Sequence, residues 1–443
     1  MQPVLYLTIE IMNREFDSRL LMAAHALEAG LTVVVGQQWS IFQNLANFPP
    51  GVLVAKTVNA IQARSMAAAK ACGHIVAATD EEVLAMAVAD GFLKAFSPIA
   101  VEACDLFLAQ SDQHKESIEQ AFPQMRGKVA VTGNPRVDLM GPALRKKFDG
   151  EAQKIRDEVG PFVLFNTNYS YTNSVWGSLQ GVANIAIQAG VLDPKKPETV
   201  EEFKQNVAFE VANRQAMAAM MNWTANHLAS HRVVIRPHPG EKPEYWQQAA
   251  NNHPRVRVVP RSHHIPWILA SDMVVHTSCT TGLEAAIMGK PAINLSPAAD
   301  SPWYRLYVMG KVNPIFPDWQ KASEAVTAYF KSASGPIADN APYRAELLRY
   351  FPNLASNDSA KKITKAFIDI LAARGAKVGP AYQWSPLPQG YVRPERSAVQ
   401  KDKMSATVEQ VAATLQYLRD VEGLSRKIKL SLLDDSLFLV VPE

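Results

Sequence analysis

Short apolar runs rich in β-branched residues recur along the chain, and each run ends in small or polar residues. In the first third they lie at residues 51–56, 73–79, 106–111 and 128–135, with helix-like apolar patterns between them. A strand that is buried on both faces reads as a continuous apolar run, and strands that alternate with helices form parallel sheets. The spacing therefore predicts an α/β protein with a doubly wound sheet.

The N-terminal residues already contain a complete βαβ unit. Residues 4–11 and 31–36 are predicted strands, and the amphipathic pattern over residues 16–30 predicts a helix that ends at Gly30. A parallel pair of strands needs a crossover of this kind. The first sheet is therefore expected to begin at the N-terminus.

The same pattern restarts after a charged stretch at residues 145–158, and a chain of 443 residues is too long for one ordinary core. We predict two Rossmann-like domains that face a cleft. The predicted parts are an N-terminal domain at 1–144, a C-terminal domain at 159–335 with an insertion at 177–204, a crossover helix at 336–372, and a helical C-terminal extension at 373–443 for which the sequence suggests no function.

The composition is that of an ordinary soluble globular protein, with 48% apolar and 20% charged residues. A formal net charge of +3 gives no reason to expect a nucleic-acid partner. The N-terminus lacks the basic segment of a signal peptide, and no run of 18 apolar residues occurs. Three isolated cysteines indicate a reducing compartment, so we expect a cytoplasmic protein.

The stretch "VVIRPHPGEKPEYW" places polar residues directly after a predicted strand. The prolines at 237 and 239 disfavour helix and hold His238 in an extended turn. Arg236, His238 and Pro239 therefore lie at the carboxyl end of a strand, where open α/β sheets bind ligands. The alternatives are a structural role for His238 and a surface ion pair for Arg236.

A second strand end lies in "DMVVHTSCTTGLEAAIMGKP", where hydroxylated residues precede a predicted helix. Free backbone N–H groups and hydroxyls at a helix N-terminus form an anion site. The alternative is ordinary N-capping with a buried glutamate. The candidate residues are Ser278, Thr280 and Thr281 as donors to a phosphate, Gly282 as a point of close backbone approach, and Glu284 as an acceptor for a ribose diol.

The two strand ends together would surround one phosphate from both sides. Asn166 begins a polar run after another predicted strand and either lines the same cleft or belongs to a simple loop. The chain has no Walker sequence and no GxGxxG motif, which argues against a nucleoside triphosphatase and a classical dehydrogenase. No paired acids with metal-ligand spacing lie beside this turn, so we expect no metal.

Acidic residues follow two strands of the first predicted domain. Asp80, Glu81 and Glu82 stand at the end of the strand at 73–79, where a carboxylate could act as a general base. They could equally be N-cap and first-turn acids of a helix. Glu15 lies after the first strand and is a second candidate base, with a capping-box or surface glutamate as the alternative.

The segments "RPHP" and "HTSCTTGLEAAIMGKPAI" resemble the nucleotide-binding half of GT-B glycosyltransferases that use CMP-activated 2-keto sugar acids, such as polysialyltransferases and Kdo transferases. The opening "IEIMNREFDSRLLMAAHALEAG" and the later "ATDEEVL" resemble the bacterial surface carbohydrate biosynthesis protein family. The resemblance covers most of residues 1–330 and does not include the C-terminal extension.

The resemblance implies roles for several of these residues. His238, Pro239, Ser278, Thr280 and Thr281 would hold the CMP phosphate. In the enzymes that the chain resembles, an acidic pair before a glycine supplies the base. Here Val83 stands where that glycine is expected, so Glu81 is the first choice and Asp80 the second. In the related lipid A Kdo transferases the base lies after the first strand, which would correspond to Glu15.

The function expected from this resemblance is an inverting, metal-independent glycosyltransferase without a cofactor. It would move Kdo or another nonulosonic acid from a CMP-sugar onto a bacterial surface polysaccharide, either lipopolysaccharide or capsule. Its partners would be the nucleotide-sugar donor, the glycan acceptor, and peripherally the inner membrane or glycan assembly proteins. Alternatives are a UDP-GlcNAc 2-epimerase, which "TGNPRVD" also resembles, a CDP-glycerol or CDP-ribitol phosphotransferase, and a catalytically silent scaffold.

Overall fold

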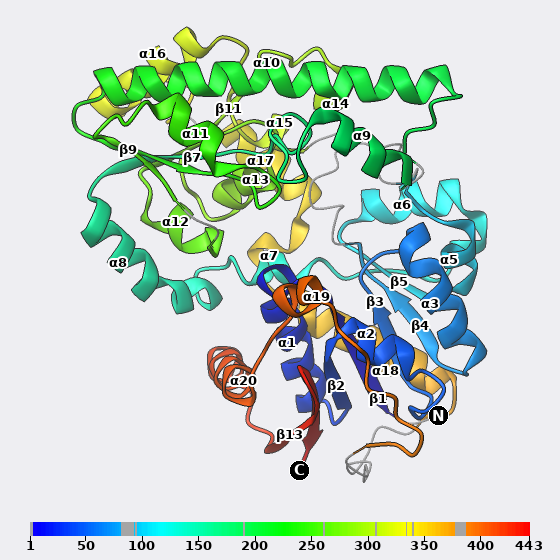
Figure 1. Cartoon of the computed structure of the whole chain (residues 1–443). Coiled ribbons are helices and arrows are strands. Elements are labelled where there is room, and N and C mark those ends of the chain that lie inside the picture. The colour runs from blue at the N-terminus through cyan, green and yellow to red at the C-terminus, as the bar shows by residue number, and fades with distance from the viewer. Residues whose placement is uncertain are drawn as a thin grey trace. The chain divides into compact units, whose positions relative to one another are not determined.

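The computed structural model describes residues 3–80, 93, 95–188, 191–259, 262–305, 308–333, 335–338, 341–376 and 387–443. The chain forms two compact α/β units (Figure 1). Unit 1 contains the described residues up to 80, from 93 to 145 and from 348 onward, whereas unit 2 contains those of residues 146–347. Unit 1 is therefore built from both ends of the described chain.

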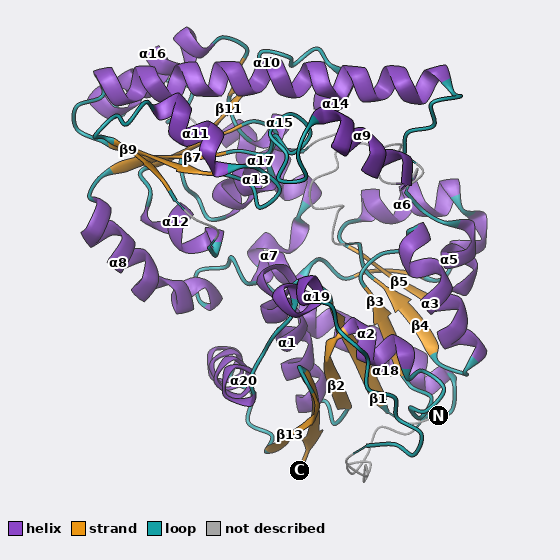
Figure 2. Ribbon diagram, in the orientation of Figure 1, coloured by secondary structure: helices purple, strands orange, loops and turns teal. Residues whose placement is uncertain are grey.

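Unit 1 has an eight-stranded sheet with the order β13-β14-β2-β1-β3-β4-β5-β6 (Figure 2). The pairs among β1 to β6 are parallel, as the apolar runs predict. The strands are β1 (Val4–Ile9), β2 (Thr32–Gln37), β3 (Val52–Ala55), β4 (Ile75–Ala78), β5 (Leu106–Ala109) and β6 (Val129–Val131).

Helices from distant parts of the sequence cover this sheet. Helix α1 packs against α18 and α20, and all three contribute to one apolar cluster with the sheet. The helices of unit 1 are α1 (Met12–Glu28), α2 (Gln38–Gln43), α3 (Ala60–Ala71), α5 (Pro98–Ala103), α6 (Asp112–Ala121), α7 (Pro135–Asp138), α18 (Ser359–Ala373), α19 (Ala398–Lys403) and α20 (Val408–Glu422). Helix α17 (Ala341–Tyr350) lies where the two units divide along the chain.

The C-terminal extension, expected to be helical, also contains a β-hairpin. Its helices α19 and α20 precede β13 (Ile428–Asp434) and β14 (Leu437–Pro442). Strand β14 pairs antiparallel with β2, with Val440 opposite Val33. The run "LFLVV" is continuously apolar, and an edge strand leaves backbone hydrogen-bonding groups open to a further strand. The extension is therefore part of the first sheet.

Unit 2 has a six-stranded parallel sheet with the order β12-β11-β10-β7-β8-β9. Its strands are β7 (Phe162–Asn166), β8 (Arg232–Arg236), β9 (Val256–Val258), β10 (Met273–His276), β11 (Ala292–Leu295) and β12 (Ile315–Phe316). The sequence predicts the first five. The two residues of β12 are too few to give a recognisable apolar pattern.

The longest helix of the described chain is α10, and it begins within the segment expected to be an insertion. Pro197 starts this helix at a position where its missing N–H needs no acceptor. The helices of unit 2 are α8 (Asp149–Val159), α9 (Leu179–Gln188), α10 (Pro197–His227), α11 (Pro243–Ala250), α12 (His264–Ala270), α13 (Thr280–Ile287), α14 (Pro302–Arg305), α15 (Met309–Val312) and α16 (Trp319–Ser332). Within the described part of the chain, no helix is apolar over enough residues to cross a membrane.

Candidate functional site

A row of polar residues crosses the carboxyl edge of the unit 2 sheet. Asn294 is the register partner of His276, and Asn166 is the partner of Arg236, on four adjacent strands. In each of these strands the preceding residue belongs to the apolar cluster beneath α10. Successive side chains of a strand point to opposite faces, so the polar row lies on the face away from that cluster.

Asn166 and Arg236 are buried in this row with unsatisfied polar atoms. Asn166 is 1% exposed, and neither its amide oxygen nor its amide nitrogen has a hydrogen-bond partner among the described residues. The Arg236 guanidinium donates to the carbonyl of Ser262, whereas its Nε finds no acceptor there. A buried unsatisfied polar group costs about 1–3 kcal/mol. Such groups are expected where a ligand supplies the missing partner.

Ser278 adds a third unsatisfied group in the turn after β10. Its backbone N–H donates to the side-chain oxygen of Asn294 at 3.1 Å, but its hydroxyl has no partner in the described structure and the residue is 3% exposed. Ser278 also has φ of +43°, a left-handed conformation that non-glycine residues rarely adopt. Such strain concentrates at functional sites.

The turn continues into α13, whose start carries hydroxyls and no side-chain cap. The N-cap residue Cys279 makes no side-chain capping hydrogen bond of the usual kind, although its carbonyl accepts from the N–H of Gly282 at 2.9 Å. Thr280 is partly exposed beside it, and the Thr281 hydroxyl lies 3.1 Å from the Cys279 sulfur. Burial raises the pKa of the Cys279 thiol, which is therefore uncharged at neutral pH.

Gly282 is explained by a contact within the protein. A Cβ at this position would lie 2.1 Å from Nε2 of His276, so only glycine allows α13 to pack on this ring. His276 is completely buried, and burial lowers its pKa to about 3, which keeps the ring neutral. The sequence suggested that Gly282 admits a ligand, whereas the structure gives a packing reason for the glycine.

Glu284 also has a protein partner. Its carboxylate lies 2.7 Å from Nε2 of His264, and Glu284 is 5% exposed. The sequence suggested a contact with a ribose diol. The structure therefore gives this carboxylate a protein neighbour, the first residue of α12.

Glu241 organises the "RPHPGE" turn and was not identified from the sequence. Its carboxylate is 2% exposed and accepts hydrogen bonds from the Thr167 hydroxyl at 2.6 Å and from the His238 N–H at 3.1 Å. It also accepts from Nε1 of Trp246 at 3.0 Å and from the amide of Asn173 at 3.3 Å. One buried acid thus joins the loop after β7 to the turn after β8.

His238 is exposed at the tip of this turn, next to Pro239. Its Nδ1 accepts a hydrogen bond from the N–H of Gly240 at 3.1 Å. A neutral imidazole that accepts at Nδ1 carries its proton on Nε2. His238 is therefore held as a hydrogen-bond donor, which suits an anionic ligand.

The loop that follows Asn166 has a second buried acid beneath it. Glu210 of α10 accepts hydrogen bonds from the backbone N–H groups of Tyr171 at 3.0 Å and Thr172 at 2.9 Å. Burial outweighs these bonds and raises the pKa of Glu210 to about 7. Glu241 and Glu210 together fix the backbone of the polar loop, although neither belongs to it.

In unit 1, Asp80 lies just beyond β4 and is 7% exposed. It lines a small cavity with Arg19, Gln110, His114 and other residues. His114 was not a candidate from the sequence. Its Nδ1 accepts from the N–H of Gln110 at 3.3 Å, and burial lowers its pKa to about 3. Glu81 and Glu82 lie outside the described residues.

Glu15 lies in the first turn of α1 and is 2% exposed. Its carboxylate accepts a hydrogen bond of 2.7 Å from the backbone N–H of Glu10. This contact holds the loop before α1, but it is neither the capping box nor the surface position that the sequence left open, because the N-cap residue is Ile11 and Glu15 is buried. Strand β3 separates β1 from β4, so Glu15 and Asp80 follow strands that are not neighbours in the sheet.

Among the residues that the structure describes, no group of three or more His, Cys, Asp or Glu side chains is arranged to hold a metal ion. The polar edge of the unit 2 sheet instead presents amides, hydroxyls and one guanidinium. These groups are hydrogen-bond donors of the kind that bind phosphate directly.

No known protein family and no curated protein sequence matches the chain. Solved structures do match it. The wall teichoic acid polymerase TagF is 10% identical, with a TM-score of 0.53 over 84% of this chain and 90% of that chain. The UDP-GlcNAc 2-epimerase of Neisseria meningitidis bound to UDP-GlcNAc is 13% identical, with a TM-score of 0.52 over 83% and 100%. A further UDP-N-acetylglucosamine 2-epimerase is 13% identical, with a TM-score of 0.52 over 84% and 96%. The predicted GT-B-type fold is confirmed.

Proposed function

We propose that the protein is a glycosyltransferase that takes its sugar from a pyrimidine nucleotide. The donor is a CMP-activated Kdo or other nonulosonic acid, and the acceptor is a bacterial surface glycan. The observation that carries this proposal is the set of unsatisfied, buried polar groups of Asn166, Arg236 and Ser278 at one edge of the unit 2 sheet. A phosphate with its ribose would satisfy them.

The charge of these groups favours a donor with one phosphate. Of the candidate donors to phosphate, Arg236 carries a permanent positive charge, whereas Asn166, Ser278, Thr280 and Thr281 are neutral. The phosphodiester of a CMP-sugar carries one negative charge, which one guanidinium can balance, while the carboxylate of a 2-keto sugar acid adds a second charge on the sugar. A CDP or UDP conjugate would bring a second charge to the same edge.

In the proposed reaction a carboxylate takes the proton of the acceptor hydroxyl. The hydroxyl oxygen then forms a bond to the anomeric carbon, and the bond from that carbon to the phosphate oxygen breaks. CMP leaves with the electron pair, stabilised by the donors of Arg236, His238 and Ser278. Glu81 is the first candidate for the base, and Asp80 and Glu15 are the others.

Two other reactions compete with this proposal because the same fold occurs in other enzymes. TagF is a wall teichoic acid polymerase, and one of its variants has been soaked with CDPG. This favours transfer of glycerol phosphate or ribitol phosphate from a CDP conjugate as the second candidate. An epimerase of UDP-GlcNAc is the third, and it would need no acceptor.

A thermal-shift series with CMP, CDP, UDP and GDP tests the nucleotide. A ligand at a hundred times its Kd stabilises by about 2.7 kcal/mol, so CMP should raise the melting temperature more than the others. Asn166→Ala and Ser278→Ala should lose most of the CMP shift. Asn184→Ala, at an exposed position of α9, is the matched control. A larger shift with CDP or UDP, unchanged in both variants, would contradict the proposal.

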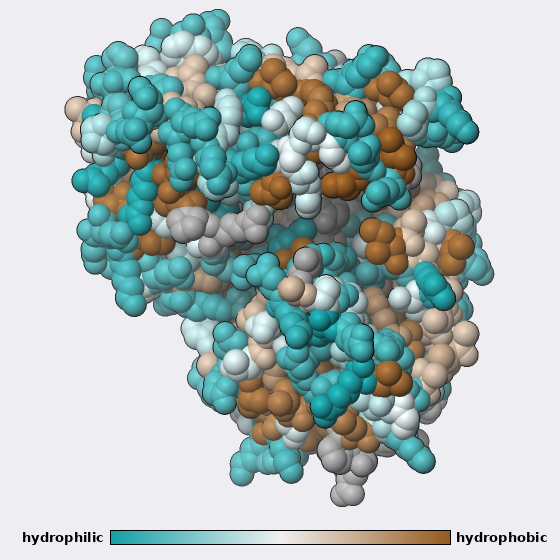
Figure 3. All heavy atoms as spheres, in the orientation of Figure 1, coloured by the Kyte–Doolittle hydropathy of each residue, from teal (hydrophilic) through white to brown (hydrophobic). Residues whose placement is uncertain are grey.

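We also propose that the protein contacts the inner membrane peripherally through the surface around α9. Residues 174–192 contain no charged side chain. Figure 3 shows hydrophobic side chains gathered near α9. The exposed large apolar residues of this segment are Val175, Trp176, Leu179, Ile185, Ile187 and Val191. Exposed apolar residues with a tryptophan are typical of segments that lie in the membrane interface.

Flotation with vesicles of anionic phospholipid tests this contact. The triple variant Trp176→Ser, Ile185→Ser, Ile187→Ser should remain with the unbound protein, while wild type floats. Ile61→Ser is the control, because Ile61 is an exposed apolar side chain of α3 in unit 1, outside this segment. If wild type does not float, or if the triple variant floats equally, the membrane contact is rejected.

A further inference from the structure

The C-terminal extension reaches the loop that follows the first strand. Lys403 is the last residue of α19, and its Nζ lies 2.8 Å from Oε1 of Glu10. Lys56, which follows β3, pairs with the other carboxylate oxygen of Glu10. Two lysines from separate parts of the sequence thus hold one acid at the carboxyl edge of the unit 1 sheet.

Glu10 is ionised in this arrangement. Its partial burial opposes ionisation, but the hydrogen bonds and charges of Lys403 and Lys56 lower its pKa to about 2. The backbone N–H of the same residue donates to the carboxylate of Glu15 at 2.7 Å. Glu10 therefore connects the extension to a buried acid that is one of the three candidate bases.

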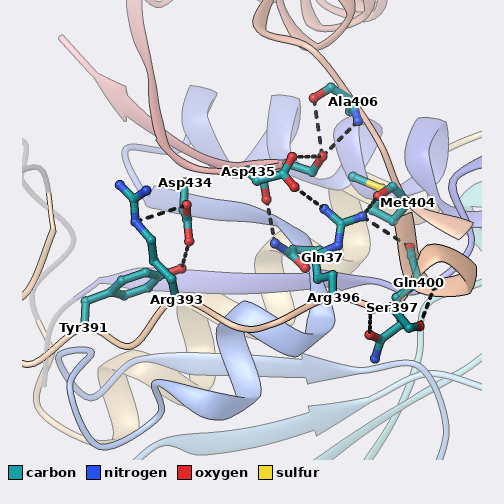
Figure 4. Close-up of polar contacts among 11 residues, drawn as sticks. Gln37, Tyr391, Arg393, Arg396, Ser397, Gln400, Met404, Ala406, Asp434 and Asp435 are labelled. Carbon is teal, nitrogen blue, oxygen red and sulfur yellow. Dashed lines mark hydrogen bonds and ion pairs between the residues drawn. The ribbon is translucent and has the colours of Figure 1, made fainter. Parts of the chain in front are cut away.

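The position of α19 is itself fixed by contacts within the extension (Figure 4). The side chain of Arg396 is 3% exposed and donates to Asp435 at 2.9 Å and to the carbonyl of Gln400 at 3.2 Å. It also donates to the carbonyl of Met404, whose side chain is completely buried in the core. Lys403 lies between these two anchored residues, Gln400 and Met404.

The hairpin that anchors α19 is seated on β2 at close range. The N–H of Gln37 donates to the carbonyl of Ser436 at 2.9 Å, and a Cβ at Gly36 would lie only 2.1 Å from that oxygen. Gly36 therefore permits an approach that no other residue would allow. The extension is thus fixed to the sheet on one side and to the loop after β1 on the other.

We propose that Lys403 is a positioning residue, through which the C-terminal extension holds the loop at residues 10 and 11, the first turn of α1 and the carboxylate of Glu15 in place for catalysis. This inference rests on the proposed function, because it concerns the acceptor side of the transfer. The ion pair is partly exposed and contributes little to global stability. The effect of the ion pair should instead appear as slower hydrogen exchange in the loop and as higher turnover.

Lys403→Met keeps the length of the side chain and removes its charge. In this variant the backbone amides of residues 10–14 should exchange hydrogen faster, and kcat should fall about tenfold or more. The KM for the donor should not change, because the donor groups lie in unit 2. Lys403→Arg should restore both quantities. Lys401→Met, an exposed neighbour on the same helix, is the matched control.

Two outcomes separate the inference from the proposed function. Unchanged exchange and unchanged kcat in Lys403→Met would overturn the inference, whatever the reaction. If the wild-type protein has no transferase activity but Lys403→Met still exchanges these amides faster, then Lys403 supports this loop and the proposed function is rejected. Circular dichroism and melting temperatures confirm that the variants are folded, and Glu10→Gln should reproduce the loop effect if Lys403→Met fails to fold.

Discussion

The hydroxyl of Thr167 donates a hydrogen bond of 2.6 Å to the carboxylate of Glu241, 74 residues away in the chain. This contact joins the segment after β7 to the turn after β8. The same carboxylate accepts from the backbone of His238. The donor groups of two strand ends are therefore held together by one acid, and both of its carboxylate oxygens already accept hydrogen bonds from protein groups.

Glu241→Gln should disrupt this junction. The new amide nitrogen cannot accept a hydrogen bond, so Nε1 of Trp246 and the amide of Asn173 would face a donor. We expect the free energy of unfolding to fall by about 1–3 kcal/mol and CMP binding to weaken. Chemical denaturation and calorimetric titration measure the two effects. Glu244→Gln, at an exposed position of α11, should change neither, and a stable, fully binding Glu241→Gln would contradict this role.

Gly282→Ala should destabilise unit 2 although alanine favours helix. The added methyl group would meet the ring of His276 at 2.1 Å, and overpacking of this kind costs about 1–3 kcal/mol. Gly150→Ala is the control, because no atom lies within 4 Å of its added Cβ in α8. That change should stabilise by up to about 1 kcal/mol. Equal stabilisation of both variants in urea would show that the His276 contact is not rigid.

The raised pKa of Glu210 predicts a pH-dependent stability. Its pKa is about 7 in the folded protein and near 4.5 when the chain is unfolded, so between these values the folded state binds more protons. The free energy of unfolding should therefore fall as pH rises from 4.5 to 7, by up to about 1.4 kcal/mol per pH unit. Glu210→Gln should remove this component. Urea midpoints that depend equally on pH in both proteins would argue against the shift.

The candidate bases are separated by isosteric variants. Glu81→Gln keeps the size of the side chain but cannot take a proton, so it should abolish transfer while CMP binding stays near wild type. Glu15→Gln and Asp80→Asn should have smaller effects, since one carboxylate oxygen of Glu15 already accepts from the Glu10 N–H. An inactive Glu15→Gln beside an active Glu81→Gln would move the base to the loop after β1. Full transfer in all three variants would show that none of these carboxylates is the base.

Transfer should persist after treatment with EDTA. In the proposed mechanism, the charge on the leaving phosphate is balanced by the Arg236 guanidinium and by hydrogen-bond donors. Initial rates with and without EDTA measure this directly. Complete loss of activity that Mg²⁺ or Mn²⁺ restores would show that the leaving group departs with the help of a metal.

His238→Ala, which removes one donor, should lower kcat by about a hundredfold.

The strand ends could be predicted because they depend on local sequence. Arg236 follows a run of β-branched residues, and a change from apolar to polar residues marks where such a run leaves the core. The same reasoning located Ser278 and Asn166. The alternation of strands with helices predicts parallel sheets but not the order of the strands within each sheet. It also does not predict that β14 pairs antiparallel with β2.

The supporting contacts could not be predicted because they join residues that are distant in sequence. Glu210 acts on Tyr171 from 39 positions away, and Lys403 acts on Glu10 from 393 positions away. A buried acid and an exposed acid look alike in a sequence. Gly282 shows the same limit, since a glycine near a predicted phosphate site suggests close ligand approach, and its packing against the ring of His276 is seen only in the structure.

The two ends of unit 1 determine the order in which the protein can fold during synthesis. Unit 2 has all of its described strands once Phe316 has left the ribosome, whereas β2 waits for β14, which begins at Leu437. Until then the edge of β2 is unpaired, and an unpaired edge invites association with other chains. The contiguous unit can therefore mature first, and the last residues of the hairpin complete a sheet whose first strands were made four hundred residues earlier, on the order of tens of seconds at ordinary rates of translation.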